Sequence, residues 1–264
     1  MRGGWASSVP YSTIRKPNNV NGLCNTPPQN IRNALPSTNT PKVETVTPLT
    51  ALFVAKDSIY KSFDFIDCWD EERDARKYIG FDRVIAHPPC QKWGAMAKVN
   101  FSRWGGKHNA PWNDGGCFFS ALAAVRLNGG VLEHPAKSQA WNFFGLTKPE
   151  RGKWIKARDG YGWVCEVWQS AYGHRANKAT WLYYVGNEKP YDLDWSRPVG
   201  SCQVGFHDQR GKEKNKPTLS RKEANATPIG FALELIKMAR PVPKNRAEKG
   251  IKLSVSIPQN RKSR

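Results

Sequence analysis

The chain has 264 residues, and its 41 lysine and arginine residues against 22 aspartate and glutamate residues give a net charge of +19 at pH 7. Charges or prolines interrupt every apolar run before the twenty or so residues that a membrane-spanning helix needs, so a membrane protein is not expected. The positive charge favours a polyanionic partner such as a nucleic acid. Six cysteines without a C-x-x-C pair argue against a zinc ribbon or a disulfide framework and suit a reducing cytoplasm, which is the expected location.

The N-terminal part of the chain is rich in Asn, Pro, Ser and Thr, and it holds few residues that build a core. Residues 1–47 are therefore predicted to form a disordered arm. Two apolar runs follow, 50–55 and 63–68, and each predicts a buried strand. Phe53 lies in the first run, and Asp70 comes just after the second.

The run Val84-Ile85-Ala86 predicts a third buried strand, which leads into Pro88-Pro89-Cys90-Gln91. Proline fixes φ and lacks an N–H, so the strand must end here and hold Cys90 at its carboxyl edge. Open α/β sheets carry out chemistry at this edge. A thiol there can act as a nucleophile if Lys92, or a helix that starts at Gln91-Lys92, lowers its pKa; the alternative is a half-buried structural cysteine.

Residues 92–116 are rich in Trp, Gly, Lys and Arg and show little helical or strand periodicity. This long loop has two interpretations: it closes over a nucleobase, or its tryptophans pin it to the body of the protein. The apolar run 117–125 then predicts a buried helix, which returns the chain to a short strand at 129–135 that carries Glu133.

Two further segments complete the pattern. Residues 172–180 contain Arg175 and Lys178 and precede an apolar strand at 181–186. Asn225-Ala226-Thr227-Pro228 resembles a helix start, with Asn225 or Thr227 as the cap and Pro228 at the first helical position. The amphipathic helix that follows is expected to bury Phe231, Leu235, Ile236 and Met238.

Taken in chain order, these segments resemble the motifs of DNA cytosine-5 methyltransferases, a Rossmann-like family, and the chain looks like a reduced, phage-type member. The resemblance implies that the Cys90 thiolate adds to carbon 6 of a cytosine flipped out of double-stranded DNA. It implies that Glu133, with a raised pKa, protonates N3 of that base. Arg175 or Lys178 would then hold the base O2 or a phosphate.

The same resemblance implies S-adenosylmethionine as the methyl donor, with Phe53, Asp70, Pro88 and Asn225 as its contacts. Two features depart from the family. His134 and Pro135 stand where the family has Asn-Val, and the Gly-rich loop after the first strand is missing. Backbone amides of such a loop normally approach the cofactor.

Two other functions remain open on the sequence. His87, His134 and His174 fall near predicted strand edges and, with Cys90 or Glu133, would suit a metal-dependent hydrolase or nuclease. The missing glycine loop instead favours a non-catalytic DNA-binding protein on a decayed methyltransferase scaffold.

The expected fold is α/β, with a Rossmann-like, methyltransferase-like domain at 48–239 whose mostly parallel sheet is flanked by helices. Within this domain, residues 141–200 are predicted to form a reduced recognition region. Residues 240–264 carry eight Lys or Arg and one Glu, and they are expected to be a basic tail. This tail and the arm at 1–47 would be flexible.

Overall fold

The computed structural model describes residues 48–94, 97–106, 110–204 and 216–240. The predicted arm at 1–47 and the tail beyond residue 240 lie outside these residues. The fold is a mixed α/β fold built on one seven-stranded sheet in the order β2-β1-β3-β4-β7-β6-β5. The strands are β1 (Leu49–Leu52), β2 (Ile66–Trp69), β3 (Arg83–Ala86), β4 (Gly130–Pro135), β5 (Ile155–Lys156), β6 (Trp163–Trp168) and β7 (Ala179–Val185).

The two halves of the sheet differ in direction. Strands β2, β1, β3 and β4 are parallel, whereas β7 runs antiparallel to β4, and each later pairing, β7 with β6 and β6 with β5, is antiparallel. The strand order therefore reverses at β1, because β2 lies on one side of β1 and β3 lies on the other. Residues 155–185, within the segment predicted to hold a recognition region, build the antiparallel half.

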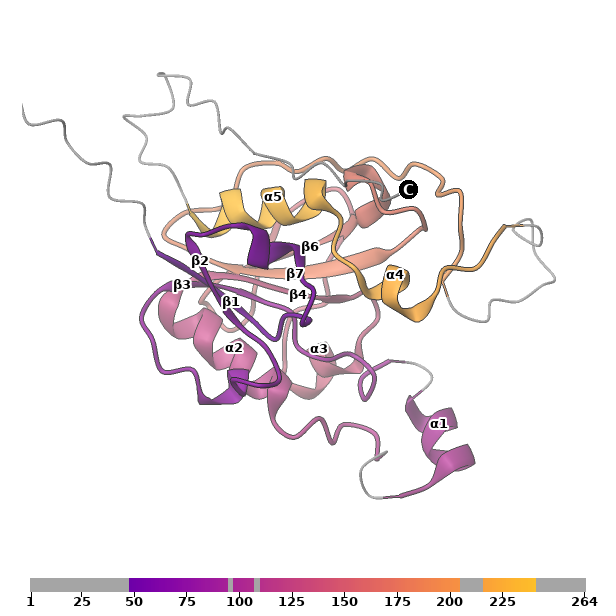
Figure 1. Cartoon of the computed structure of the whole chain (residues 1–264). Coiled ribbons are helices and arrows are strands. Elements are labelled where there is room, and N and C mark those ends of the chain that lie inside the picture. The colour runs from indigo at the N-terminus through magenta and orange to yellow at the C-terminus, as the bar shows by residue number, and fades with distance from the viewer. Residues whose placement is uncertain (1–47, 95–96, 107–109, 205–215, 241–264) are drawn as a thin grey trace, which may run out of the picture. The chain divides into compact units, whose positions relative to one another are not determined.

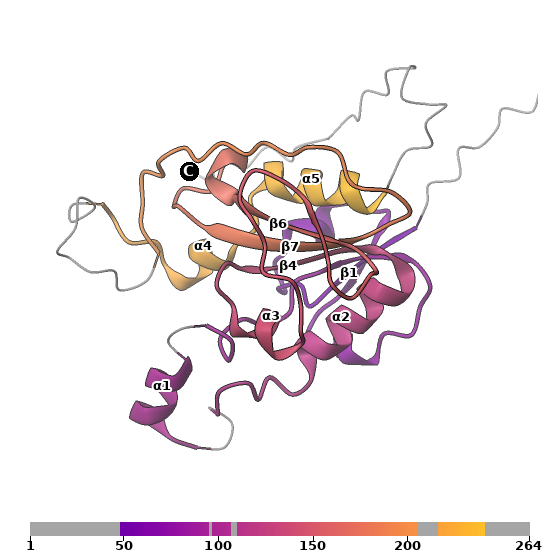
Figure 2. The same cartoon turned by 180° about the vertical axis from the view of Figure 1, so that it is seen from behind.

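Helices cover both faces of the sheet (Figure 1), with α5 on one face and α2 and α3 on the other. Figure 2 shows the same arrangement from behind. The α-helices are α1 (Ala97–Trp104), α2 (Cys117–Asn128), α3 (Gln139–Phe143), α4 (Arg221–Asn225) and α5 (Ile229–Ala239), and the 3-10 turns are η1 (Ile59–Ser62), η2 (Ala75–Lys77) and η4 (Gln169–Tyr172).

Successive side chains of a strand point to opposite faces of the sheet, so the hydrophobic core has one part on each face. In β3, Ile85 packs in the cluster beneath α5, whereas Val84 and Ala86 pack in the cluster beneath α2. Phe231, Leu235, Ile236 and Met238 are all buried in the α5 cluster, so the predicted face of this helix is confirmed. Burial of each such side chain contributes about 1.5–3 kcal/mol.

Arg83 joins the start of β3 to the end of α5. Its Nε donates to the Ala239 carbonyl at 2.7 Å, and its Nη2 donates to the Val185 carbonyl at 3.0 Å. The last carbonyls of a helix have no partner within the helix, so a side-chain donor stabilises its end. Helix α5 therefore ends at the amino edge of the parallel strands.

Several boundaries differ from those expected. The first strand ends at Leu52 rather than at residue 55, because Phe53 has a φ of 57° and leaves the sheet. Residues 97–104 form α1, so the expectation that 92–116 lacks helical structure is wrong. Only Ala97 of α1 is buried, which explains why no apolar stripe marked it in the sequence. Pro228 is the N-cap of α5 and not its first helical residue.

Gly130 is the position at which the parallel sheet depends most on the absence of a side chain. Its φ is 119°, and a Cβ there would lie 2.0 Å from the Val84 carbonyl oxygen of β3.

We expect Gly130→Ala to lower the free energy of unfolding by roughly 3 kcal/mol or more, because β3 and β4 would have to separate. Gly152→Ala is the matched control, since Gly152 also has a positive φ, 71°, but a Cβ at this residue would meet nothing within 4 Å. Its loss should be about 1–2 kcal/mol from backbone strain alone. Urea unfolding of both variants measures the difference, and equal losses would contradict the steric account.

Candidate active site at the carboxyl edge of the sheet

Cys90 lies just beyond the carboxyl end of β3, where the sequence predicts it. The His87 N–H donates to the Leu52 carbonyl at 3.0 Å, and this bond continues the β1–β3 pairing by one residue. The buried Pro88 and exposed Pro89 follow, and the Cys90 carbonyl accepts from the Trp93 N–H at 3.0 Å. The prolines thus end the strand and a tight turn holds the half-buried thiol near the edge.

Residues 90–94 form this turn and not the expected helix start, so Cys90 does not sit at a helix N-terminus. Burial raises the pKa of the Cys90 thiol, and the charge of Glu133 raises it further, while Lys178 and Arg221 lower it. The expectation of a lowered thiol pKa is therefore wrong for the free protein. Two cations that oppose the rise, Lys178 and Arg221, come from other elements of the fold.

Strand alternation places His87 and Glu133 on the face of the sheet that α5 covers. The ring Nδ1 of His87 lies 3.0 Å from Glu133 Oε2, and its Nε2 lies 3.0 Å from the hydroxyl of Tyr60 in η1. Gln169 Nε2 donates to Glu133 Oε1 and to Thr180 Oγ1, each at 3.0 Å. We call these five residues, which come from η1, the end of β3, β4, η4 and β7, the His87 network.

The His87 network holds Glu133 as a carboxylate. Burial raises the pKa of Glu133, but the hydrogen bond from His87 and the charges of Lys178, His87 and His134 outweigh it and lower the pKa to about 2. The raised pKa expected for an acid at this position is therefore wrong for the free protein. An isolated buried carboxylate would be unstable, and here its two oxygens each have a partner.

The two residues that were candidates for holding an anion, Arg175 and Lys178, have different partners in the structure. Lys178 is half-buried and lowers the pKa of both Cys90 and Glu133, so its ammonium group lies within electrostatic reach of both. Arg175 instead forms an exposed ion pair with Glu223 at 3.1 Å. The structure thus brings Cys90, Glu133 and Lys178 together and directs Arg175 elsewhere.

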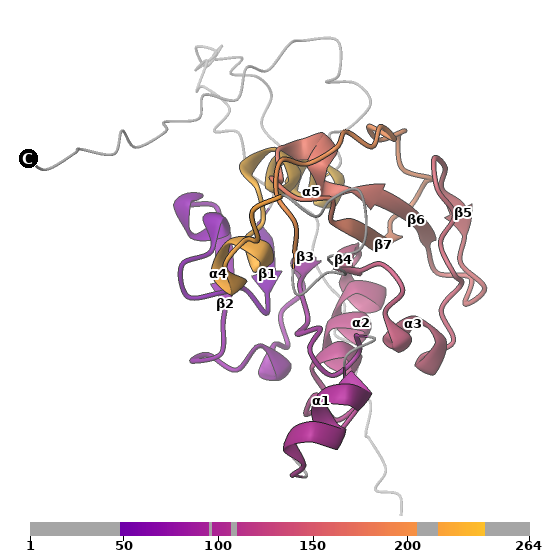
Figure 3. The ribbon, with the colours of Figure 1, turned by 90° about the vertical axis from the view of Figure 1, so that its right-hand side faces the viewer.

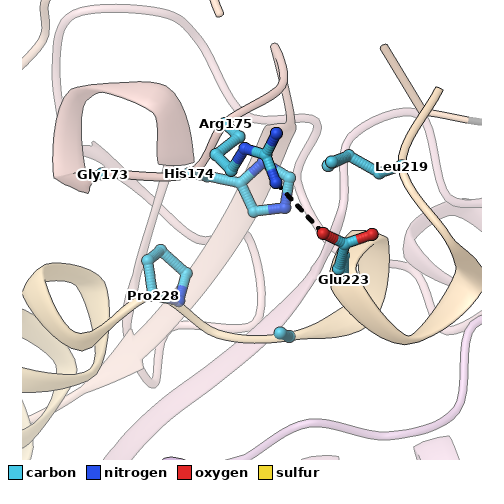
Figure 4. A pocket seen from close by; sticks show the side chains of 7 residues that line it. Gly173, His174, Arg175, Leu219, Glu223 and Pro228 are labelled. Carbon is cyan, nitrogen blue, oxygen red and sulfur yellow. Dashed lines mark hydrogen bonds and ion pairs between the residues drawn. The ribbon is translucent and has the colours of Figure 1, made fainter. Parts of the chain in front are cut away.

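The Arg175–Glu223 pair spans a neighbouring pocket between the end of η4 and helix α4 (Figure 4). The pocket has a volume of about 210 Å³. His174 is buried on its wall, and burial lowers the pKa of this imidazole. The pocket is lined by Gly173, His174, Arg175, Leu219, Glu223, Ala226 and Pro228.

The candidate cofactor contacts do not fit S-adenosylmethionine in this structure. Asp70 accepts hydrogen bonds from Lys61 Nζ at 2.7 Å and from the Glu72 and Arg73 N–H groups at 3.1 and 3.2 Å, so it caps its own turn. Phe53 leaves β1 without the glycine-lined backbone that approaches a cofactor.

The other two candidate cofactor contacts, Pro88 and Asn225, do not fit S-adenosylmethionine either. Pro88 is buried and offers no N–H, and Asn225 is the last residue of α4. The space beside the ends of β1 and β3 instead holds the Tyr60 and His87 rings, whose centroids are 5.3 Å apart.

Residues 92–116 were expected either to close over a nucleobase or to be pinned to the body of the protein by their tryptophans, and the tryptophans do not all fit one of these interpretations. Trp93 is 1% exposed, packs on Phe118 and donates to Asp114 at 2.8 Å, so it pins the segment to the body. Trp104 at the end of α1 is 76% exposed. Figure 3 shows α1 beyond the end of α2, projecting from the layered part of the fold.

The three histidines of the metal hypothesis do not come together. His134 points to the α2 face of the sheet, opposite to His87, and packs against the rings of Phe118 and Trp141. In the ranges that the structure describes, no three His, Cys, Asp or Glu side chains are grouped as metal ligands would be. Among those residues, no helix is long and apolar enough to cross a bilayer.

Sequence reasoning missed Tyr60, Gln169 and Thr180. Tyr60 is fully buried although it follows a run of polar residues, and Gln169 belongs to no recognisable motif. Their partners are 27 and 36 residues away along the chain, so only the fold connects them. The alternation of β4 does place Glu133 and His134 on opposite faces, and this pattern was readable from the sequence.

No model of a known protein family matches the sequence, and no curated protein matches it significantly.

His134 makes the stability of the fold sensitive to acid. Burial lowers its pKa to about 4 from an ordinary value of 6.5. Because the unfolded chain binds this proton more readily, stability is lost as the pH falls from 6.5 to 4, by up to roughly 3 kcal/mol.

We expect His134→Phe to remove this loss, so that its free energy of unfolding changes less than that of the wild type between pH 6.5 and 4.5. Urea unfolding at several pH values measures the slope. His174→Asn is the control, and it should keep most of the wild-type slope. An unchanged slope in His134→Phe would contradict the assignment.

Proposed function

We propose that the chain is a DNA-modifying transferase similar to the cytosine-5 methyltransferases, in which the Cys90 thiolate attacks carbon 6 of a flipped cytosine. The observation that carries the proposal is the convergence of Cys90, Glu133 and Lys178 at the carboxyl ends of two adjacent parallel strands. A pyrimidine needs a nucleophile at carbon 6 and a proton donor at N3, because negative charge develops on that nitrogen. Cys90 would be the nucleophile, and Glu133 would pass a proton to N3 once it has received one.

The arrangement of strands supports a Rossmann-like interpretation of the fold. In open α/β sheets, ligands bind outside the carboxyl ends of the strands, where the strand order reverses. Here the order reverses between β1 and β3, and Cys90 follows β3. The position of the thiol therefore agrees with the general rule for this class of sheet.

Charge supports DNA as the partner. The chain carries a net charge of +19, and Lys178 and Arg221 act on the thiol itself. Cations near a nucleophile both attract the phosphate backbone and favour the thiolate.

The position where a cofactor would bind is filled by side chains of the protein itself. This favours a second candidate function, a non-catalytic DNA-binding protein. Asp70 is bonded within its own turn, and the Tyr60 and His87 rings occupy the edge between β1 and β3. A DNA-binding protein that has lost its cofactor would look the same. Thiol addition at carbon 6 needs no cofactor, so it separates the two functions.

We expect the wild-type chain to form a covalent adduct with duplex DNA in which 5-azacytosine replaces cytosine, because the ring nitrogen at position 5 makes carbon 6 more electrophilic. Denaturing gels measure the adduct. Cys90→Ser should abolish it, whereas Cys117→Ser, the matched half-buried cysteine in α2, should retain it.

A wild-type chain that binds DNA but forms no adduct would contradict the transferase and favour the non-catalytic alternative. Adduct formation by Cys90→Ser would exclude Cys90 as the nucleophile. In the non-catalytic alternative, salt-sensitive DNA binding survives the loss of the thiol.

Lys178 provides a separate test of the site. We expect Lys178→Met to raise the pKa of Cys90 further, because a cation that favours the thiolate is lost, and to slow its alkylation by iodoacetamide near pH 8 by up to about tenfold. Mass spectrometry of the Cys90 peptide measures the rate. Lys153→Met, which removes an exposed lysine paired with Glu150, should leave the rate unchanged.

A further inference from the structure

In the part of the chain that the structure describes, His87 is the one titratable group in contact with both a buried carboxylate and a buried phenol. Both its ring nitrogens have a partner at 3.0 Å, Glu133 on one side and Tyr60 on the other. Tyr60 is fully buried, and Glu133 is 8% exposed. The two contacts therefore fix the ring from both ends, away from bulk water.

The hydrogen bonds restrict where protons can lie. Gln169 offers Glu133 an amide N–H, which cannot be given up as a proton. The contact with His87 is different, because an imidazole can either donate to the carboxylate or accept from a carboxylic acid. His87 is thus the one hydrogen-bond partner of Glu133 in the described residues that can change the protonation of this carboxyl group.

We infer that His87 is the positioning residue that supplies and orients the proton of Glu133, so that the acid of the site is the His87–Glu133 pair and not Glu133 alone. This inference rests on the proposed function. It resolves the conflict between a carboxyl group that must donate a proton and surroundings that hold it ionised. The proton is stored on the ring and delivered through the carboxyl group.

The step starts from the Cys90 thiolate, a Glu133 carboxylate and a His87 imidazolium. The thiolate sulfur forms a bond to carbon 6, the π electrons of the C5–C6 bond move through the ring, and N3 takes up a proton that passes from Nδ1 of the imidazolium through Glu133. His87 is left neutral, and Glu133 is again a carboxylate. The Tyr60 hydroxyl accepts from Nε2 while that nitrogen carries a proton and donates to it when it does not, so Nε2 keeps a partner in either state.

The same pair also acts on the nucleophile. The negative charge of Glu133 is one of the causes that raise the pKa of Cys90. A proton held on the pair offsets this charge and so favours the thiolate. Titratable groups that act on the pair are Tyr60 of η1, Cys90 after β3, His174 after η4 and Lys178 before β7, together with the charge of His134, whose ring lies on the opposite face of the sheet.

The first test is the pH dependence of adduct formation with 5-azacytosine DNA. His87→Asn keeps an amide N–H that can reach Glu133 but cannot carry the proton. We expect this variant to form adduct at least about tenfold more slowly near pH 7 and to change the pH profile of the reaction, because it lacks the group that carries the proton. His174→Asn should keep the wild-type profile. A folded His87→Asn chain with the wild-type profile would overturn the inference and leave the proposed function standing.

The second test needs no activity, so it decides the inference even if the wild-type chain forms no adduct. Nitrogen-15 NMR of histidine-labelled protein at pH 8 reports which ring nitrogen carries the proton. We expect neutral His87 to be protonated on Nδ1, where Glu133 accepts, with Tyr60 donating to Nε2. In Tyr60→Phe the Nδ1 proton should remain, because Glu133 still fixes it. A proton on Nε2 in the wild type would overturn the inference.

Discussion

The hydrogen bond between His87 and Glu133 is the interaction on which the site depends. It joins two side chains from adjacent parallel strands at the edge where both strands end. A carboxylate buried to this degree is stable only if both its oxygens have partners, and here the partners come from the end of β3 and from η4. The position of Glu133 relative to Cys90 is therefore set by the sheet as a whole and not by a loop.

The register of the sheet is the constraint behind this bond. Because side chains alternate, a shift of one residue in β4 would exchange Glu133 for His134 on the α5 face. Gly130 prevents such a shift, since its close approach to Val84 admits no other residue. On the opposite face, the aromatic rings around His134 give that side chain an apolar setting. Two neighbouring residues of one strand therefore differ in charge: Glu133 is an anion, whereas His134 is neutral.

Much of the fold could be predicted from the sequence. The apolar runs at β1, β2, β3, β4 and β7 were evident, and helix α2 before β4 follows from the length of the apolar run there, whereas α1 was not expected. The pairing of β5 with β6 was not evident, because β5 has only two residues. Helix α4 was overlooked although Ser220 and Glu223 form a capping box, which is a sequence signal.

The site could be predicted only in part. Cys90 and Glu133 are found by their place at the ends of apolar strands, whereas Lys178 was named, beside Arg175, only through the family resemblance. Their charge states could not be predicted, because they depend on burial and on the mutual approach of Cys90, His87, Glu133 and Lys178, which come together only in the folded chain. Arg175 and Lys178 are three residues apart, yet one pairs with Glu223 and the other acts on Cys90.

Both ends of the described domain attach at the same edge of the sheet. Strand β1 begins there at Leu49, and Arg83 ties the last residue of α5 to the start of β3. Cys90 lies at the other edge, a strand length of about 13 Å away for four residues. A linkage made at residue 48 or residue 240 would therefore lie behind the thiol and leave the edge that carries Cys90 open.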